Sequence, residues 1–546
     1  MSVSKRDILS ENKRCSEIGV EMLKNEGSAA DAMIATVLCG GVLASYHNDI
    51  GGGGFALLHV PNGTTELIDF RETAPMAIDN MAYIRNPNAS EFGGSASGVP
   101  GEVRGPEYLS KNYGKLPWKF IVDRVAQVAE EGFTVTEDMM TYFQIAIKFR
   151  GHNFLVHDPS WAKDFAPNGT MVGIGDTMTR KRYASTLRTI ANYGPDAFYK
   201  GDIAKDVLDA IQSTSGNMTK QDLLDYKIMR RNTSSITYRG YNLTSTTAPT
   251  SGAVSLSILK ILERYGDFFQ AGNEPLSTHR LNEAIRYGYG RRSLLGDPGF
   301  NRTHDIEEYE RWMLADSTAW LTKIDDHKTH HDPGYYIPSP IGLGSDGQRR
   351  HGNCLNHNYK PRFGSQVMTE KTGIVLNNEI DDFYIARASD NPDIFPENRL
   401  QPGKRPLSTI SPTIITRDGE VYFITGAAGG PQIATTTLQG IINVLDRGMN
   451  AFDALADPRL HDQMFPDRSN VENPYSSRKA KHNGYNQTIV EYLKEKGHNS
   501  NWFGSIDMSQ SIRLLRDGSI EAVGEPRQKD SGGTLWPTQE RCLYQG

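Results

Sequence analysis

The chain has 546 residues, of which 38% are hydrophobic and 23% are charged, as expected for a globular protein with a buried core. This composition excludes a disordered, collagen-like or coiled-coil chain as a description of the whole sequence. The 59 basic and 65 acidic residues give a net charge of -6, too balanced for a nucleic-acid-binding surface, so we expect a small-molecule or peptide substrate and no nucleic-acid partner.

The sequence contains no recognisable membrane or targeting segment. Its most apolar stretch, residues 32–44, is shorter than the roughly 20 residues that span a bilayer. Residues 1–15 carry several charges and no apolar core, so we expect no signal peptide there. The four cysteines include no CxxC pair, which excludes a zinc ribbon and leaves a single disulfide possible. Several Asn-x-Ser/Thr sequons are a weak indication of glycosylation.

The predicted elements at the N-terminus are two helices and a hairpin. Apolar residues recur at helical spacing from Cys15, Gly27 interrupts them, and an alanine-rich second helix follows. After the glycines at 51–54, residues 55–60 and a stretch ending at Phe70 predict two strands joined by a Pro-Asn-Gly turn. Because a strand follows the glycines, without Gly-Lys-Ser/Thr, we interpret them as close backbone packing beside a site and not as a phosphate loop.

The rest of the chain alternates between helical and strand-rich regions. Residues 105–325 read mainly as helices broken by Gly and Pro. Beyond Met368 strands dominate: residues 412–416 and 420–425 flank an Arg-Asp-Gly turn and predict a hairpin, and residues 433–445 predict a helix. Helices before and after two groups of hairpins predict layered α and β structure around one long core.

Several side chains beside predicted turns are suited to a charged ligand. Arg71 ends the first hairpin, where a guanidinium can hold a carboxylate through two hydrogen bonds; an ion pair with Asp69 or Glu72 is the alternative. Residues 377–382 supply carboxylates and amides for an ammonium group, or only a polar turn. The glycine-rich turn at 426–431 can present backbone amides to an oxyanion, or be simply a tight turn.

The densest group of potential metal ligands lies in one polar stretch. It consists of Asp325, Asp326, His327, His330, His331 and Asp332. No HExxH pattern is present, and exposed runs of His and Asp in loops are commonly just solvated. A metal-dependent hydrolase that uses these residues is therefore the weakest of three functional hypotheses. The absence of Gly-x-Ser-x-Gly argues against an α/β-hydrolase mechanism.

In order and spacing, these segments resemble the gamma-glutamyltransferase (gamma-glutamyl transpeptidase, glutathione hydrolase) family of the N-terminal nucleophile hydrolase superfamily. The matching phrases cover nearly the whole chain, at residues 18–23, 27–32, 51–55, 69–75, 98–103, 295–298, 363–365, 372–383, 405–412 and 425–430. The resemblance implies an α+β fold of four αββα layers. It also implies transfer of a γ-glutamyl group from glutathione or its conjugates to water or to an amino-acid or peptide acceptor, without a cofactor or metal.

The resemblance assigns roles to individual residues. Arg71 matches the arginine that holds the substrate α-carboxylate, and Glu379 and Asp382 match the pair that holds its α-amino group. Ser408 and Thr409 match the pair that also binds this carboxylate. It therefore favours the functional interpretation of each position, because all of them converge on one zwitterionic γ-glutamyl group.

Members of the family are similar in cutting their own precursor before a threonine. The freed α-amine, with a reference pKa of about 7.7–8.0, then acts as the base for the hydroxyl of the same residue. Thr329, in the Asp-His-Lys-Thr-His-His frame of residues 326–331, is the best match, with Lys328–Thr329 as the cleaved bond. Gly429 and Gly430 match the oxyanion-hole amides.

Cleavage there implies a helix-rich segment, residues 1–328, and a strand-rich segment, residues 329–546, intertwined in one domain as a heterodimer. Cys15 and Cys39 fall where eukaryotic members resemble one another in having a disulfide. The resemblance therefore implies the secretory pathway, as an extracellular, vacuolar or membrane-anchored protein whose leader is missing from this chain.

The resemblance is interrupted between residues 332 and 361. The family has a substrate-binding asparagine three residues before Phe363, whereas this chain has Lys360, and residues 332–361 are polar and rich in Gly and Pro. Read one nucleotide later, residues 356–361 are compatible with Thr-Thr-Thr-Ile-Asn-Leu, as the family would have, so a faulty gene model is one explanation. The main alternative to an active enzyme is an inactive, unprocessed homologue that keeps the ligand-binding residues.

Overall fold

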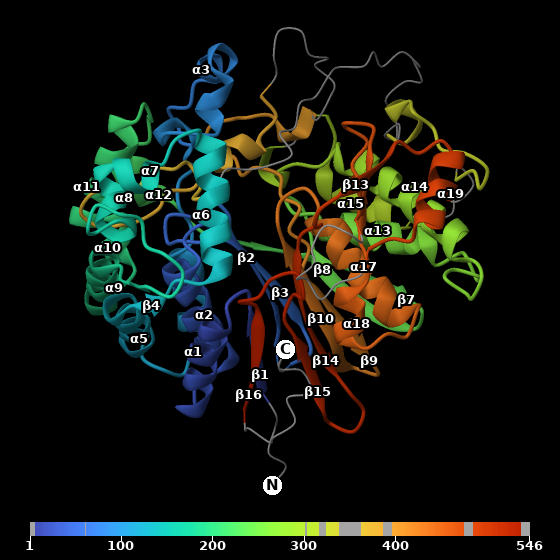
Figure 1. Ribbon diagram of the computed structural model, residues 1–546, viewed down its shortest axis with the longest axis horizontal. Helices are drawn as coiled ribbons and strands as arrows, with labels where there is room; N and C mark the ends of the chain where they lie inside the picture. The colour runs from blue at the N-terminus through green and yellow to red at the C-terminus, as the bar shows by residue number, and fades with distance from the viewer. Residues whose placement is uncertain are drawn as a thin grey trace.

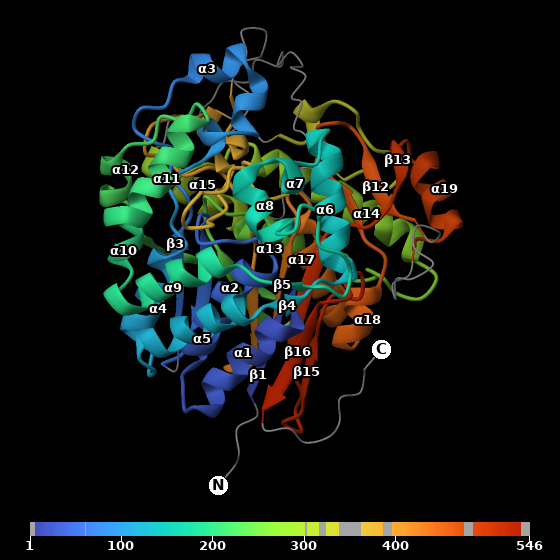
Figure 2. The same cartoon turned by 60° about the vertical axis from the view of Figure 1, so that its left-hand side comes forward.

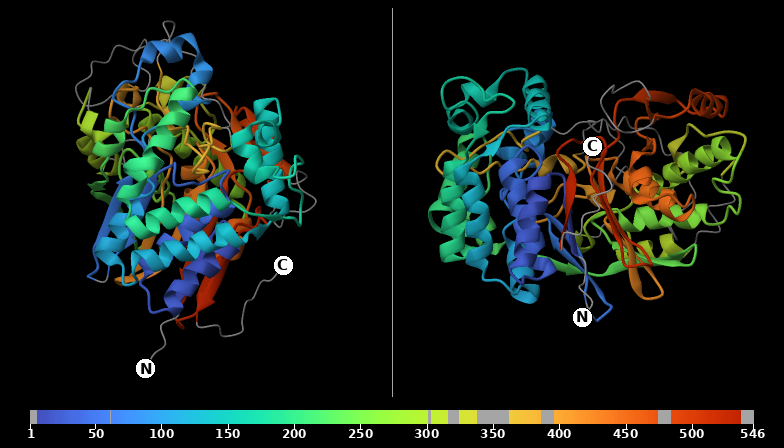
Figure 3. Two further views of the ribbon diagram at one scale, coloured as in Figure 1. Left: turned by 90° about the vertical axis from the view of Figure 1, so that its left-hand side faces the viewer. Right: turned by 60° about the horizontal axis from the view of Figure 1, so that its bottom comes forward.

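The computed structural model describes residues 6–60, 62–300, 303–315, 324–337, 362–385, 396–473 and 484–536. Within these residues, α-helices gather on two outer sides and β-strands lie between them (Figure 1). The right-hand view of Figure 3 shows the same arrangement from below, with strands separating the two groups of helices. The predicted mixture of helices and sheets is therefore confirmed. No described helix combines the length and the apolar character needed to cross a bilayer.

The first helical group is built on the predicted N-terminal pair. It includes α1 (Lys13–Lys24), α2 (Ala29–Leu43), α5 (Trp118–Glu131) and α9 (Lys181–Tyr193). Helix α2 begins with a capping box, in which the Ser28 hydroxyl and the Asp31 carboxylate each bind the other residue's backbone N–H.

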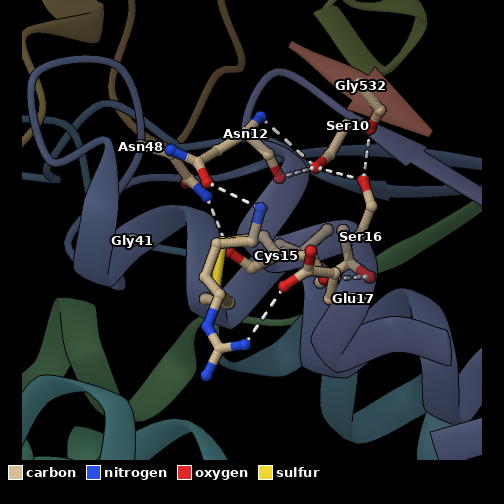
Figure 4. Close-up of a disulfide and its surroundings, with 12 residues drawn as sticks. Ser10, Asn12, Cys15, Ser16, Glu17, Gly41, Asn48 and Gly532 are labelled. Atoms are coloured by element: carbon tan, nitrogen blue, oxygen red, sulfur yellow. Dashed lines mark hydrogen bonds and ion pairs between the residues drawn. A yellow bond between two sulfur atoms is a disulfide. The ribbon is translucent and has the colours of Figure 1, made fainter. Parts of the chain in front are cut away.

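A disulfide joins Cys15 of α1 to Cys39 of α2, and both cysteines are fully buried (Figure 4). The pairing implied by the family resemblance is thus confirmed. With a sequence separation of 24 residues, this cross-link limits the unfolded chain and stabilises the fold by roughly 3 kcal/mol in the chain-entropy description.

The predicted N-terminal hairpin forms part of a three-stranded sheet. Gly54 pairs with Phe70 and His59 with Thr65, as expected for two strands joined by the Pro-Asn-Gly turn. The strands are β2 (Gly54–His59), β3 (Thr65–Phe70) and β6 (Met229–Arg231), in that order.

A six-stranded antiparallel sheet joins strands from distant parts of the sequence. Its order is β15 (Ile520–Val523), β14 (Met508–Leu514), β10 (Glu420–Ala428), β9 (Thr413–Arg417), β8 (Tyr241–Thr246) and β7 (Thr233–Tyr238). The predicted hairpin at 412–425 is confirmed as β9–β10. The expectation of mainly helices over 105–325 missed β6, β7 and β8, because these short strands are rich in Thr, Ser and Arg and lack a clear apolar alternation.

The second helical group packs against the six-stranded sheet. It includes α13 (Gly252–Leu262), α14 (Glu274–Arg292) and α17 (Ile433–Leu445), whose bounds equal the predicted helix. The buried apolar residues form two large clusters, one around each helical group, and a small third one. Phe363, from the C-terminal part of the chain, lies in the first cluster, where its ring contacts those of Phe143, Phe154, Trp161 and Phe165.

The two ends of the described chain lie side by side. Strand β1 (Arg6–Ser10) pairs antiparallel with β16 (Gly532–Trp536), with Arg6 opposite Trp536 and Ser10 opposite Gly532 (Figure 2). The Ser16 hydroxyl also donates to the Gly532 carbonyl at 2.7 Å. The first and last strands therefore hold each other in place.

Candidate active site

A cavity of about 330 Å³ opens where the glycine loop before β2 meets the end of β10. Its wall includes Gly52 and Gly53, residues 375–379, residues 428–432 and residues 505, 507 and 508. Glu379, Gly429 and Gly430 are the predicted site residues that line it directly. The contacts below connect Arg71, Asp382, Ser408 and Thr409 to this wall.

Arg71 follows β3 and is buried, with 5% of its surface exposed. Its guanidinium lies 2.7 Å from the Glu379 carboxylate and contacts that of Asp382. The alternative of a guanidinium ion pair with Asp69 is not observed; the Arg71 backbone N–H donates to Asp69 instead. Although burial alone would lower it, the charges of Glu379, Asp382 and Glu72 raise the pKa of Arg71.

Supporting contacts fix the backbone at Arg71. Its carbonyl accepts a hydrogen bond of 2.8 Å from the Tyr226 hydroxyl. The Asp69 carboxylate pairs with Arg231 of β6 at 2.5 Å and with Arg405 at 3.2 Å. No local pattern indicated a role for Tyr226 or Arg231, because both lie more than 150 residues from Arg71 along the chain.

Asn377 holds the carboxylate turn against the glycine loop. Its side-chain N–H groups donate to the carbonyls of Gly51 and Gly98, each at 2.8 Å, and its side-chain oxygen accepts from the N–H of Glu379 at 3.1 Å. Glu379 begins the short 3-10 helix η5 (Glu379–Asp382). A methyl group on Gly51 would come within 2.2 Å of the Val375 carbonyl oxygen, which confirms that these glycines serve close backbone packing.

Ser408 and Thr409 connect the segment before β9 to the glycine turn. The Ser408 N–H donates to the Pro249 carbonyl at 2.6 Å, and the Ser408 carbonyl accepts from the Ser251 hydroxyl at 2.7 Å. The Thr409 hydroxyl donates to the Gly430 carbonyl at 2.5 Å. The structure thus places the predicted serine–threonine pair next to the predicted oxyanion turn.

Gly429 and Gly430 form the turn between β10 and α17. Their φ angles of 142° and 100° lie in a region that residues with a Cβ rarely adopt. A methyl group on Gly429 would also come within 2.1 Å of a carboxylate oxygen of Asp507. A flexible glycine turn before the N-terminus of a helix is suited to stabilise negative charge in the cavity.

Thr329 is not among the residues that line this cavity. Its hydroxyl donates to Glu283 at 2.6 Å and lies 3.0 Å from the Tyr336 hydroxyl, and its N–H donates to the Lys496 carbonyl at 2.8 Å. Glu283 lies on α14, and Arg292, at the end of this helix, is near the charge of Asp382. The nine residues from Glu283 to Arg292 correspond to roughly 13 Å along the helix axis. The structure therefore does not bring Thr329 together with the other predicted residues.

The surroundings of Thr329 nevertheless suit proton transfer. Burial raises the pKa of Glu283 to about 7, opposed by the hydrogen bond from Thr329, the charge of Arg286 and the hydrogen bond from Tyr336. Near neutral pH this carboxylate is present in both protonation states. A hydroxyl and a carboxylate at this distance have the geometry of a nucleophile and its base.

The potential metal ligands around Thr329 do not converge. The Asp326 carboxylate binds Arg280 at 2.6 Å, whereas the His331 ring lies 2.7 Å from Asp467. Over the ranges that the structure describes, no group of three His, Cys, Asp or Glu side chains is arranged to hold a metal ion.

Glu102 contacts the glycine loop, and its carboxyl group should make the stability of the fold depend on pH. Its N–H donates to the Gly52 carbonyl at 2.9 Å, and its side chain is buried. Burial, with a contribution from Asp49, raises the pKa of Glu102 to about 8. The folded state therefore keeps a proton that the unfolded state releases, so this group lowers stability as pH rises from about 4.5 to about 8.

We expect Glu102→Gln to remove this pH dependence. The free energy of unfolding of the variant minus that of the wild type should therefore rise by about 3 kcal/mol from pH 5 to pH 8. Urea unfolding at the two pH values measures the difference. Glu107→Gln, in the adjacent helix α4 (Arg104–Tyr113), removes an ion-paired carboxylate and should keep the wild-type slope. Parallel slopes for wild type and Glu102→Gln would contradict the prediction.

The chain is similar to known proteins over nearly its whole length. The family model described as Gamma-glutamyltranspeptidase matches residues 15–535. The glutathione hydrolase proenzyme of Arthroderma benhamiae is 45% identical, covering 97% of this chain and 92% of its own. The glutathione hydrolase of Aspergillus flavus is 42% identical, covering 97% and 89%, and the glutathione hydrolase proenzyme of Escherichia coli is 31% identical, covering 96% and 90%.

Solved structures agree with this assignment. Cephalosporin acylase from Bacillus halodurans has the same fold, with a TM-score of 0.79 at 23% identity over 99% of this chain and 98% of its own. Helicobacter pylori gamma-glutamyltranspeptidase gives a TM-score of 0.55 at 30% identity, covering 63% of this chain and 97% of that one. From the family match and these relatives, the chain belongs to the gamma-glutamyltranspeptidase family.

Proposed function

We propose that the protein is a gamma-glutamyltransferase and glutathione hydrolase. It cleaves the γ-glutamyl amide of glutathione and its conjugates and transfers the γ-glutamyl group to water or to an amino-acid or dipeptide acceptor, without a cofactor. The carrying observation is the contact of one buried guanidinium, that of Arg71, with two partly exposed carboxylates, those of Glu379 and Asp382, beside the cavity. A γ-glutamyl zwitterion supplies a carboxylate for Arg71 and an ammonium group for Glu379 and Asp382. Binding therefore exchanges the ion pairs between Arg71 and the two acids for ion pairs between these side chains and the substrate.

Ser408 and Thr409 complete this proposed cradle and bind the same α-carboxylate. The γ-carbonyl then lies at Gly429 and Gly430, whose amides stabilise its oxyanion. The proposed nucleophile is the hydroxyl of Thr329, which forms a γ-glutamyl ester that water or the acceptor amine resolves. Because Thr329 does not line the cavity in the intact chain, this role requires that cleavage of the preceding bond releases it from Glu283.

The remaining proposals concern assembly and location. Cleavage of the Lys328–Thr329 bond yields segments 1–328 and 329–546, which stay together as a heterodimer. Their helices and sheets form the four αββα layers of an N-terminal nucleophile hydrolase. The Cys15–Cys39 disulfide supports an oxidising compartment, and hence the secretory pathway.

The second candidate is an inactive, unprocessed homologue that binds γ-glutamyl compounds without turnover. The position of Thr329 outside the cavity favours it. The departure of residues 332–361 from the family pattern supports it too, and residues 338–361 lie outside those that the structure describes. A faulty gene model for this stretch would have the same effect on the expressed chain.

One preparation of the full chain tests both candidates. An active enzyme gives two bands on a denaturing gel, with a new N-terminus at Thr329, and releases p-nitroaniline from γ-glutamyl-p-nitroanilide. The inactive homologue gives one intact band and no release, while calorimetry still detects binding of L-glutamate. Release of p-nitroaniline that is lost on chelation would instead support the metal-dependent hydrolase.

A further inference from the structure

Asp507 places a carboxyl group in the wall of the cavity, directly against the glycine turn. It precedes β14 and is 7% exposed, and its Oδ1 atom would lie 2.1 Å from a methyl group on Gly429. Its Oδ2 atom is buried and has no hydrogen-bond partner in the described part of the chain. A buried polar atom without a partner costs free energy, so its retention beside a cavity points to a ligand or a reacting group.

The backbone around Asp507 is held firmly, but its carboxyl group has no cationic partner among the described residues. Arg459 donates to the carbonyls of Ile506 at 3.0 Å and Asp507 at 2.8 Å, while its guanidinium pairs with Glu525 at 2.9 Å. The Glu525 carboxylate also accepts from the N–H of Ser509 at 2.6 Å. Among the described residues, no cation lies within ion-pair distance of the Asp507 carboxylate, although its neighbour Glu525 is paired.

The charged and titratable groups that face Asp507 come from several elements. They are Arg459, Arg362, Glu525, Glu472 and Tyr289. Burial is the largest influence and raises the pKa of Asp507 to about 8; the two arginines lower it, and the two glutamates raise it. At neutral pH the carboxyl group is mostly protonated and is a hydrogen-bond donor.

We propose that Asp507 is the proton donor to the amine that leaves when the γ-glutamyl amide is cleaved. The inference rests on the proposed function, because it requires the γ-carbonyl carbon to lie at Gly429 and Gly430. An atom bonded to that carbon is then next to the Asp507 carboxyl group. The leaving nitrogen is such an atom, and the attacking water or acceptor amine takes the same place in the second half of the reaction.

The protons balance over one turnover. As the nucleophile attacks, its hydroxyl proton passes to its base. When the carbon–nitrogen bond breaks, its electron pair stays on nitrogen, which takes the proton of Asp507 and leaves a carboxylate. In the second half, the attacking water or amine gives a proton to that carboxylate as the new bond forms, and the base returns its proton to the departing hydroxyl oxygen. Asp507 is thereby protonated again.

Two substrates with different leaving groups test this role. The amine released from glutathione is a stronger base than p-nitroaniline and depends more on protonation as it leaves. We expect Asp507→Asn, which keeps the shape but cannot donate an acidic proton, to lower kcat with glutathione by about 10²-fold. With γ-glutamyl-p-nitroanilide the loss should stay below about 10-fold, because general-acid assistance matters less there.

A matched control is Asp446→Asn. Asp446 is also a buried carboxylate, but it binds Tyr238 and Arg239 (at 2.7 Å each) and does not line the cavity. This variant should keep the wild-type ratio of the two activities. If Asp507→Asn lowers both activities equally, the acid role is overturned while the proposed function stands; if the wild type cleaves neither substrate, both fail.

The wild-type protein provides a second measurement if Asp507→Asn does not fold. With glutathione, kcat/KM should fall above a pKa of about 8 as Asp507 loses its proton, because an acid is needed. The α-amine base would instead limit the rate on the acidic side. With the anilide the alkaline decline should be much weaker, and equal declines with both substrates would overturn the proposal.

Discussion

Changing Arg71 to methionine is expected to lower kcat/KM for γ-glutamyl substrates by about 10²–10³-fold. The substitution removes the guanidinium that contacts both Glu379 and Asp382, and under the proposed function it leaves the substrate carboxylate without the cation that binds it. Breaking a buried charged pair by removing one partner typically costs about 3–5 kcal/mol. Steady-state kinetics with γ-glutamyl-p-nitroanilide measure the effect, which should fall mainly on KM because the α-carboxylate does not react.

Two variants make the Arg71 result specific. Arg71→Lys keeps the charge but loses the planar fork, so its activity should lie between those of wild type and Arg71→Met. Arg230→Met, on β6, removes a largely exposed arginine that pairs with Glu66 and should leave the kinetics unchanged. Activity within about 10-fold of wild type for folded Arg71→Met would contradict the prediction, because a single charge-assisted contact is worth more than that.

Changing Thr329 to alanine is expected to abolish both chain cleavage and turnover. The substitution removes the proposed nucleophile, and removal of a nucleophile typically lowers kcat by about 10⁴-fold or more. Thr329→Ser retains a hydroxyl at the same position and should keep part of both reactions. A denaturing gel and anilide hydrolysis, measured on the same preparations, give the two readouts.

The control for Thr329 is another buried threonine outside the cavity. Thr186, on α9, donates its hydroxyl to the Thr372 carbonyl at 2.9 Å, so Thr186→Ala removes a buried hydrogen bond without affecting the proposed nucleophile. It should be cleaved and active like the wild type. Normal hydrolysis by Thr329→Ala would show that another group attacks the substrate, and the binding residues would then need a different nucleophile.

Local patterns predicted much of the secondary structure. The helix over 433–445 and the hairpin before it were correct because a short turn and an apolar period specify them locally. Strands β7 and β8 were missed because their Thr- and Ser-rich sequences lack a clear apolar alternation. Strand β7 pairs with its neighbour β8, and β8 joins the sheet by pairing with β9, which lies far along the chain. The disulfide came from the family resemblance, since four cysteines alone allow several pairings.

The candidate site was predictable only in part, for a related reason. Arg71 and residues 377–382 were recognised as ligand groups from their own sequence, but their contact joins positions 311 residues apart and could not be derived from spacing. Asp507 carried no local signal, because its significance comes from packing against Gly429. The position of Thr329 next to Glu283 likewise depends on how α14 packs and not on the sequence around either residue.

The pairing of the first strand with the last has a mechanical consequence for a chain cut after Lys328. The two pieces would share a sheet at β8–β9 and a second one at β1–β16, and the Phe363 ring would remain embedded among aromatic rings of the other piece. Dissociation would therefore require unravelling both sheets and exposing an aromatic core to water. A nicked molecule should accordingly sediment as a single particle even at high dilution, and should come apart only when it is denatured.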